Sequence, residues 1–433
     1  MSLGFTLVRL LLDPASACGG FACDGGPTPP VLQSAERIVF GVDEEANQVE
    51  MHVQITFEGQ APDFAWIVPV PEVPELFVTT SQLFTQVALA TFPTFTLRIS
   101  DDGRCREDNE STTKDTVGSY DAVASSGDDD DYSGFDVDVV GTQAVGPYET
   151  VTLRGDSSED LLGWLNAQGY ILPDTFEDVL APYVSDGSYF VALKLAPDRT
   201  TGDLAPLGLR YPGVRATVPV QLTSISATPD MRMEVYLFGA GRGVPESYLH
   251  VRVNDAAIDW WTAGSNYPEV ITAAANEAGG HAFATDYFGP TAKIGAFLTR
   301  EPAQDVLRQI DDPYMWVTVL RNELVTAPPE VFLVIADQLH VDAATAAQIW
   351  QCPGCTSTYS VPDGFDPVLA TDDLEARVLA PLRAAQRLLD DHPRLTRMTS
   401  SLDAVEMTVD PVFVMNHDLD DQPVDNLHTA LEY

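Results

Sequence analysis

The strict alternation of apolar and polar residues over positions 49–57 is the feature that most constrains the fold of this chain. The odd positions are apolar and the even positions are polar: Val49, Met51, Val53, Ile55 and Phe57 against Glu50, His52, Gln54 and Thr56. A period of two is typical of a strand with one buried face. Residues 38–42 are predicted to be its partner, across a polar turn at residues 43–47. The sequence therefore predicts a β-hairpin near the N-terminus.

Short apolar or alternating runs predict further strands through the first half of the chain. They cover residues 64–70, 95–100, 135–145, 149–154, 189–195, 207–211, 218–226 and 231–238. Helices are expected at residues 81–91, capped by Ser81, at residues 157–168, between a Ser157 cap and Gly169, and at residues 173–184. Strands separated by short turns, rather than regular β-α-β units, favour an α+β fold over a doubly wound sheet.

Helical spacing dominates the remainder of the chain. Helices are predicted at residues 268–278, 302–310, 343–351 and 372–391. Residues 315–320 are predicted to form a short strand, and residues 331–338 either a strand or a buried helix. The expected architecture is α+β, with a β-rich N-terminal body of mostly antiparallel strands and a helix-rich C-terminal lobe.

Changes in composition and in predicted secondary structure along the chain also suggest a division into segments. Residues 1–17 are interpreted as the remnant of an export signal and residues 18–245 as the β-rich domain. Within that domain, residues 101–134 are rich in Asp, Ser, Gly and Glu and are expected to form an acidic disordered insertion. Residues 246–415 would form the helix-rich lobe and residues 416–433 a C-terminal tail.

The charge of the chain is strongly unbalanced. It has 65 acidic and 23 basic residues and a formal net charge of −42. Such a surface repels nucleic acid and anionic membranes, and no apolar run is long enough to span a bilayer. Three interpretations remain: a solubility device for a secreted protein, binding of divalent cations such as calcium, or recognition of a basic partner.

The five cysteines fit an exported protein. The sequence Ala-Ser-Ala at residues 15–17 resembles a signal-peptidase site directly before Cys18. In an oxidising compartment Cys18 would pair with Cys23, and Cys352 with Cys355, which leaves Cys105 over. If Cys18 instead carried a lipid anchor, Cys23 would need another partner, such as Cys105. The Cys-Pro-Gly-Cys motif follows a helical stretch, so a structural disulfide is favoured over half of a metal site or a redox centre.

No established catalytic motif is present. The chain lacks H-E-x-x-H, G-x-S-x-G and G-x-x-x-x-G-K-[ST]. His281 and Asp286 are spaced as an acid–base pair, although an ordinary surface pairing is the simpler interpretation. The C-terminal tail gathers weak metal candidates, although a solvated segment is the favoured interpretation: His417, Asp418, Asp420 and Asp421.

Arg394 and Arg397 are two of the few cations in this acidic chain. They lie in sequence near Asp403, Glu406 and Asp410. One interpretation is a set of ion pairs that ties the tail to the body. The other is an anion or carboxylate clamp formed by the two arginines.

Several motifs resemble a known bacterial family. A-C-G-G-F-A-C, S-A-E-R-I-V-F and D-F-A-W-I-V-P-V-P near the N-terminus resemble the family called domain of unknown function 2330. So do L-T-R-M-T-S-S-L-D-A-V-E-M-T-V-D-P-V-F at residues 395–413 and N-L-H-T-A at residues 426–430. The resemblance spans the chain from about residue 17 to its end. It implies an exported bacterial protein and supplies no catalytic residues.

Two functions from different classes follow from these observations. The first is an exported or secreted cell-envelope protein that acts as a non-enzymatic binding or structural module, with an unidentified envelope or extracellular partner. The alternative is a hydrolase-type enzyme with a site near His281 or near Arg394 and Arg397. A cleft that collects a histidine, carboxylates and an arginine would favour the enzyme.

Overall fold

The structure is a computed structural model. It describes residues 21–22, 32–58, 65–99, 135–170, 172, 175–196, 204–298, 300–324, 327–355 and 364–432. Several sequence-based predictions lie outside these residues: the export segment 1–17, the insertion 101–134, Cys18, Cys23 and Cys105.

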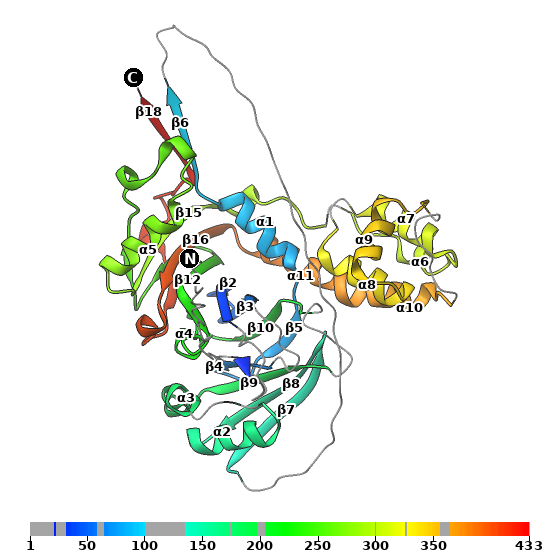
Figure 1. Ribbon diagram of the computed structural model, residues 1–433, viewed down its shortest axis with the longest axis horizontal. Helices are drawn as coiled ribbons and strands as arrows, with labels where there is room; N and C mark the ends of the chain where they lie inside the picture. Colours follow the sequence, from blue (N-terminus) through cyan, green and yellow to red (C-terminus); the bar gives the residue numbers. More distant parts are fainter. Residues whose placement is uncertain are drawn as a thin grey trace, which may run out of the picture.

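An eight-stranded sheet forms the centre of the protein (Figure 1). Its strand order is β14-β15-β16-β12-β2-β3-β10-β5. The strands are β2 (Leu32–Asp43), β3 (Gln48–Glu58), β5 (Glu75–Val78), β10 (Leu207–Pro212), β12 (Ala227–Gly239), β14 (Leu249–Val251), β15 (Ala282–Pro290) and β16 (Arg394–Leu402). Only the β12–β2 and β14–β15 neighbours are parallel. Strands from both sides of residue 245 share this sheet, and a domain division at that position stays a prediction.

The predicted N-terminal hairpin is confirmed as β2 and β3. Val42 lies opposite Val49, and Ile38 lies opposite Val53. Val49 and Val53 are buried, as the alternation requires. His52, on the opposite face of β3, is also fully buried. This face is therefore not left to solvent, because the central sheet is covered on both sides.

A five-stranded antiparallel sheet packs on one face of the central sheet, below it in Figure 1. Its order is β1 (Phe21–Ala22), β4 (Ala65–Val70), β9 (Tyr189–Leu195), β8 (Tyr148–Gly155) and β7 (Val137–Val145). One hydrophobic cluster joins Val68 and Val191 of this sheet to Phe40 and Met233 of the central sheet. Helices α2 (Ser158–Ala167) and α3 (Phe176–Ser185) cover its outer face.

Helices cover the other face of the central sheet. These are α1 (Ser81–Thr91) and α11 (Ala380–Asp391). A lobe of α6 (Gln304–Leu307), α7 (Pro313–Glu323), α8 (Pro329–Leu339), α9 (Ala343–Gln351) and α10 (Pro367–Leu374) lies beside them, at the right in Figure 1. A second cluster joins Val39, Tyr236 and Phe238 of the sheet to Trp316 and Val334 of the lobe. The predicted α+β fold, with a strand-rich N-terminal body and a helix-rich C-terminal lobe, is confirmed.

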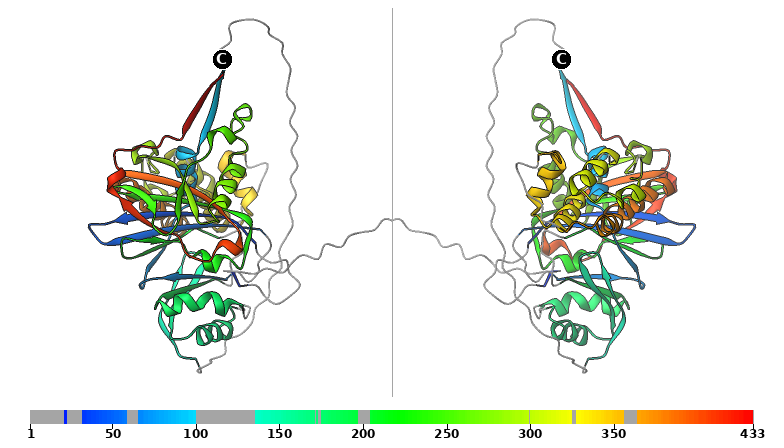
Figure 2. Two further views of the ribbon diagram at one scale, coloured as in Figure 1. Left: turned by 90° about the vertical axis from the view of Figure 1, so that its left-hand side faces the viewer. Right: turned by 90° about the vertical axis from the view of Figure 1, so that its right-hand side faces the viewer.

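The smaller elements include α4 (Val220–Thr223), α5 (Tyr267–Glu277), and a sheet of β11 (Ala216–Thr217), β17 (Val412–Asn416) and β13 (Arg242–Pro245). The parallel pair β6 (Thr94–Ile99) and β18 (Leu427–Glu432) forms a ribbon that projects from the body (Figure 2). Residues 427–432 of the predicted C-terminal tail therefore belong to this ribbon.

The strand predicted at residues 315–320 is wrong, because these residues lie inside helix α7. Asp312 caps the helix: its Oδ1 accepts hydrogen bonds from the backbone N–H groups of Tyr314 at 2.8 Å and Met315 at 3.0 Å. Pro313 occupies the first turn, where its fixed φ suits a helix. A short apolar run does not distinguish a strand from a buried helix, and here the cap decides.

The strand predicted at residues 218–226 is also wrong. Helix α4 occupies the centre of this segment. The Oδ1 atom of Asp410 accepts a hydrogen bond at 3.0 Å from the backbone N–H of Gln221, at the start of that helix. The partner lies 189 residues away in the sequence, so local pattern does not reveal it. The cap of α1 is likewise Thr80, not the predicted Ser81, since the Thr80 side chain accepts from the N–H of Gln82.

Candidate functional site

An open groove lies between the β7–β8 hairpin and the C-terminal end of α2. Its volume is about 460 Å³. It is lined by Val139, Thr142, Gln143, Ala144, Glu149, Thr150, Val151, Trp164, Gln168, Tyr170 and Lys194. The lining mixes aromatic, aliphatic, amide and charged side chains.

The floor of the groove is set by strand register. Ala144, Glu149 and Lys194 are direct neighbours on β7, β8 and β9. Their side chains therefore share one face of the sheet, with the Glu149 carboxylate beside the Lys194 ammonium. The next row on this face pairs Thr142 with Val151.

The wall of the groove is the last turn of α2. Gln168 is the C-cap, and Gly169 follows with a φ of 75°, the left-handed conformation that ends a helix without strain at glycine. Lys194 Nζ donates a hydrogen bond to the Gln168 carbonyl oxygen and lies 4.2 Å from the Tyr170 ring centroid. A cation at this position opposes the negative end of the helix dipole. Burial, together with Glu149, raises the pKa of Tyr170, so its hydroxyl stays protonated.

Trp164 brings the exposed aromatic surface of the groove. It lies on α2 and is half-buried. Within the part of the chain that the structure describes, no protein group accepts a hydrogen bond from its indole N–H, and the Gln168 side-chain amide likewise makes no hydrogen bond. These groups are open to solvent and to any ligand that enters.

Arg397 does not line this groove. It is the centre of a buried ionic network on the helix-covered face of the central sheet. Its side chain is 1% exposed. Nη2 donates to Glu234 Oε1 at 3.3 Å, and Nε lies 3.2 Å from Asp286 Oδ2. Asp286 also accepts hydrogen bonds from the hydroxyls of Tyr267 and Thr399. Arg37 on β2 adds a fourth charge, because its Nε donates to Glu234 Oε2 at 3.1 Å. Four neighbouring strands, β2, β12, β16 and β15, therefore supply the charges of this network.

The surroundings of this network explain its electrostatics. The guanidinium carbon of Arg397 lies 5.2 Å from the Phe92 ring centroid and 5.5 Å from that of Tyr236, so aromatic faces close it from solvent. Burial raises the pKa of Asp286, against the opposing effect of Arg397 and of its hydrogen-bond donors. Burial and the nearby Asp286 raise the pKa of Tyr267. The Tyr267 hydroxyl therefore stays protonated and donates a hydrogen bond to that carboxyl group.

The structure does not bring the two predicted clamp arginines together. Arg394 and Arg397 are three residues apart on β16, so their side chains leave opposite faces of the strand. Arg394 lies with its guanidinium carbon 5.8 Å from the Phe288 ring centroid. The carboxylates that Arg397 contacts are not the sequence neighbours Asp403, Glu406 and Asp410. Sequence reasoning missed Glu234, which lies on a strand 163 residues away.

His281 and Asp286 also have separate partners. The Nε2 atom of His281 lies 2.7 Å from the Glu406 carbonyl oxygen, and its ring stands edge-on to Tyr248 with centroids 5.0 Å apart. Asp286 is engaged in the Arg397 network. The predicted acid–base pair is therefore not assembled among the described residues.

The tail residues form an ion pair with the body. His417 Nδ1 lies 3.1 Å from Asp420 Oδ2, and His417 Nε2 lies 2.8 Å from Glu44 Oε2. Asp418 and Asp421 do not join this contact. Across the described ranges, no group of three histidine, cysteine or acidic residues has the geometry to hold a metal ion. Calcium binding stays a prediction.

The His417 contact should make stability depend on pH. Asp420 and Glu44 raise the pKa of His417 above its ordinary value of 6.5. The stabilisation is therefore fully present below pH 6.5 and disappears as the pH rises through the higher folded-state pKa. We expect His417→Gln to lower the thermal midpoint at pH 6 and to leave it unchanged at pH 9. The free-energy effect at this exposed site should stay below about 1 kcal/mol.

The comparison that checks this is the thermal midpoint of the wild type and of His417→Gln across that pH range. Asp418→Asn is the matched control, because it removes a neighbouring charge outside the contact. An equal loss for both variants at every pH would contradict the prediction.

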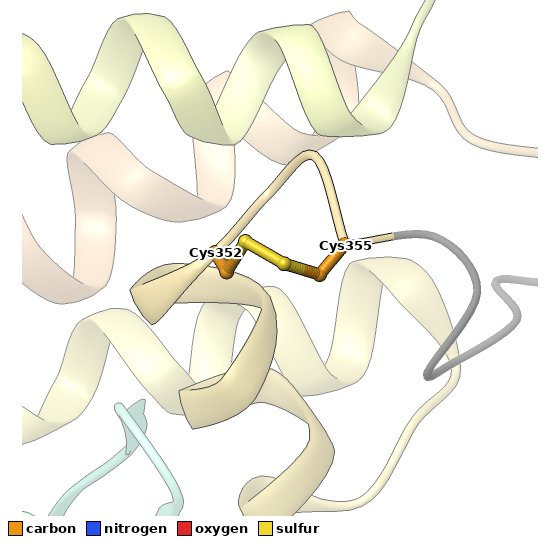
Figure 3. Close-up of a disulfide and its surroundings, with 2 residues drawn as sticks. All are labelled: Cys352 and Cys355. Atoms are coloured by element: carbon orange, nitrogen blue, oxygen red, sulfur yellow. A yellow bond between two sulfur atoms is a disulfide. The ribbon is translucent and has the colours of Figure 1, made fainter.

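The predicted disulfide between Cys352 and Cys355 is present at the end of α9 (Figure 3). The two Cα atoms are 5.4 Å apart, and the N–H of Cys355 donates to the Cys352 carbonyl oxygen at 3.0 Å. Helix α9 ends at Gln351, so the motif follows a helix instead of opening one. This placement is that of a turn staple, since a redox motif gains its reactive thiolate from a helix N-terminus.

No helix in the described residues is both long and apolar enough to cross a bilayer.

No curated protein and no solved structure matches the chain. A family model described as an uncharacterized protein conserved in bacteria matches residues 13–303. The match covers the central hairpin, the second sheet and the groove, and it ends before the lobe helices. Because it spans more than half of the 433 residues, the chain belongs to the bacterial family called domain of unknown function 2330.

Proposed function

We propose that this protein is an exported, non-enzymatic binding module of the bacterial cell envelope or extracellular space. The disulfide between Cys352 and Cys355 supports export, because such bonds persist in oxidising compartments. The net charge of −42 supports a strongly hydrated acidic surface.

The observation that carries the non-enzymatic part is where the reactive side chains lie. Arg397 and Asp286 are enclosed and neutralise each other within the sheet, and His281 faces a backbone carbonyl oxygen. The alternative hydrolase would need such groups to line one accessible cleft. The open groove instead offers Trp164, amide side chains and one carboxylate, which suit binding without proton transfer.

Export can be tested in the source bacterium with an epitope-tagged chain expressed from its own locus. We expect the protein outside the cytoplasm, with Cys352 and Cys355 unreactive toward a maleimide-polyethylene glycol reagent until a reductant is added. A Cys352→Ser/Cys355→Ser variant is the control, because it shows the gel bands that the reagent produces when these two thiols are absent. A cytoplasmic protein whose two thiols react without reduction would sink the proposal.

The non-enzymatic part has its own test. Purified protein should release no product from ester, phosphoester and glycoside reporter substrates. Turnover that is lost in His281→Ala, with an unchanged thermal midpoint, would instead establish the hydrolase.

A further inference from the structure

The groove beside α2 has two kinds of surface that face each other. One is the partly exposed indole of Trp164, which is flat and apolar. The others are the polar side chains of Gln168 and Glu149. An amide both donates and accepts hydrogen bonds, and a carboxylate accepts them. A ligand that satisfies both surfaces needs an apolar face and a rim of hydroxyl groups.

Charge narrows the ligand class further. Glu149 and Lys194 are neighbours in register, so the groove has no net charge from this pair. Lys194 is already committed to the Gln168 carbonyl and to the Tyr170 ring. An anionic ligand would meet the overall charge of −42, and a ligand of either sign would have to compete with the Glu149–Lys194 pair for a countercharge. A neutral ligand avoids both costs.

Shape agrees with this class. The volume of about 460 Å³ lies within the range of small-ligand sites. The groove is open along the side of β7, an outer strand of its sheet, so a chain longer than one ring can extend beyond it. Its walls are a helix and two paired strands, which hold the lining residues in place before a ligand arrives.

We infer that the groove is a binding site for a neutral saccharide. A pyranose ring has an apolar C–H face, which stacks on Trp164, and hydroxyl groups at its rim, which bond to Gln168 and Glu149. This inference names the ligand class of the proposed binding module and rests on that proposed function.

The test is calorimetric titration of the full chain with four neutral probes: maltotriose, cellotriose, mannotriose and tri-N-acetylchitotriose. We expect at least one probe to bind saturably. Trp164→Ala should weaken that binding about tenfold or more, since the indole supplies the stacking surface. Trp261→Ala is the matched control, because Trp261 is 70% exposed outside the groove and should leave affinity unchanged.

A second variant guards against misfolding. Glu149 lies at an exposed position of β8, so Glu149→Ala should keep the thermal midpoint of the wild type while weakening binding severalfold. Failure of all four probes to bind, or equal affinity in Trp164→Ala and Trp261→Ala, would overturn the inference. So would binding of an unstructured peptide that depends on Trp164 when no saccharide binds.

These outcomes separate the two proposals. An exported, oxidised protein that binds no probe refutes the saccharide site alone. Release of reducing ends from a bound probe refutes the non-enzymatic function while the groove stays a saccharide site.

Discussion

Replacing Arg397 with methionine is expected to lower the free energy of unfolding by about 3–5 kcal/mol. The side chain is 1% exposed and contacts both Glu234 and Asp286. Methionine fills much of the same volume but leaves Asp286 buried without a countercharge, while Glu234 keeps Arg37, whose Nε lies 3.1 Å from its Oε2. Asp286 must then take up a proton or remain as a desolvated anion, and both outcomes destabilise the folded state.

Urea unfolding followed by circular dichroism measures this loss, with Arg215→Met as the matched control. Arg215 pairs with Glu246 on the surface, where the arginine side chain is 60% exposed. Loss of that pair should cost less than about 1 kcal/mol. Equal costs for the two variants would show that the Arg397 network contributes no more than an exposed pair.

The pH dependence gives a second readout for Arg397→Met. Without the guanidinium, the folded-state pKa of Asp286 should rise further above that of the unfolded chain. A carboxyl group with a raised folded-state pKa favours the folded state most below its unfolded pKa, and this advantage is lost as the pH rises. The penalty of the substitution should therefore be smaller at pH 4 than at pH 7.

Elements with a clear local period could be predicted from the sequence. The alternation at residues 49–57 located β3, and helical spacing located α1 and α9 with the bounds that the structure has. Such elements bury a face whose periodicity is written in consecutive residues. The fold class followed from their order along the chain.

Contacts between distant strands could not be predicted in this way. Arg397 was noted as a rare cation, but its partners depend on the register of β16 with β12 and β15. The contact of His417 with Glu44 likewise spans 373 residues. Local spacing gives no information about such distant pairs. The sequence therefore suggested only carboxylates that lie near Arg397 along the chain.

The groove shows the same limit. Trp164, Glu149 and Lys194 all lie on elements that the sequence predicted. Their meeting depends on the pairing of β8 with β9 and on the packing of α2 over that sheet. The groove is also lined by amide and aromatic side chains, which suit binding more than catalysis. Isolated side chains of that kind carry no spacing signal.

Replacing Trp316 with alanine is expected to lower the free energy of unfolding by about 3–5 kcal/mol. Trp316 is 1% exposed in α7. Its Nε1 donates to Thr371 Oγ1 on α10 at 3.3 Å, and its ring stands edge-on to Phe365 with centroids 5.9 Å apart. Alanine leaves a cavity where these helices meet and removes the hydrogen bond. Trp261→Ala is the matched control, because that tryptophan is 70% exposed and should change stability by less than about 0.5 kcal/mol.

The same variant tests whether the lobe is a separate domain. Trp316 belongs to a hydrophobic cluster that also contains Val39 and Tyr236 of the central sheet. Because the cluster is continuous, we expect hydrogen exchange to accelerate together in α7 and in β12, within a single unfolding transition. Acceleration in the lobe alone would instead show that it unfolds independently of the sheet. The lobe would then be a domain whose stability depends little on its contacts with the central sheet.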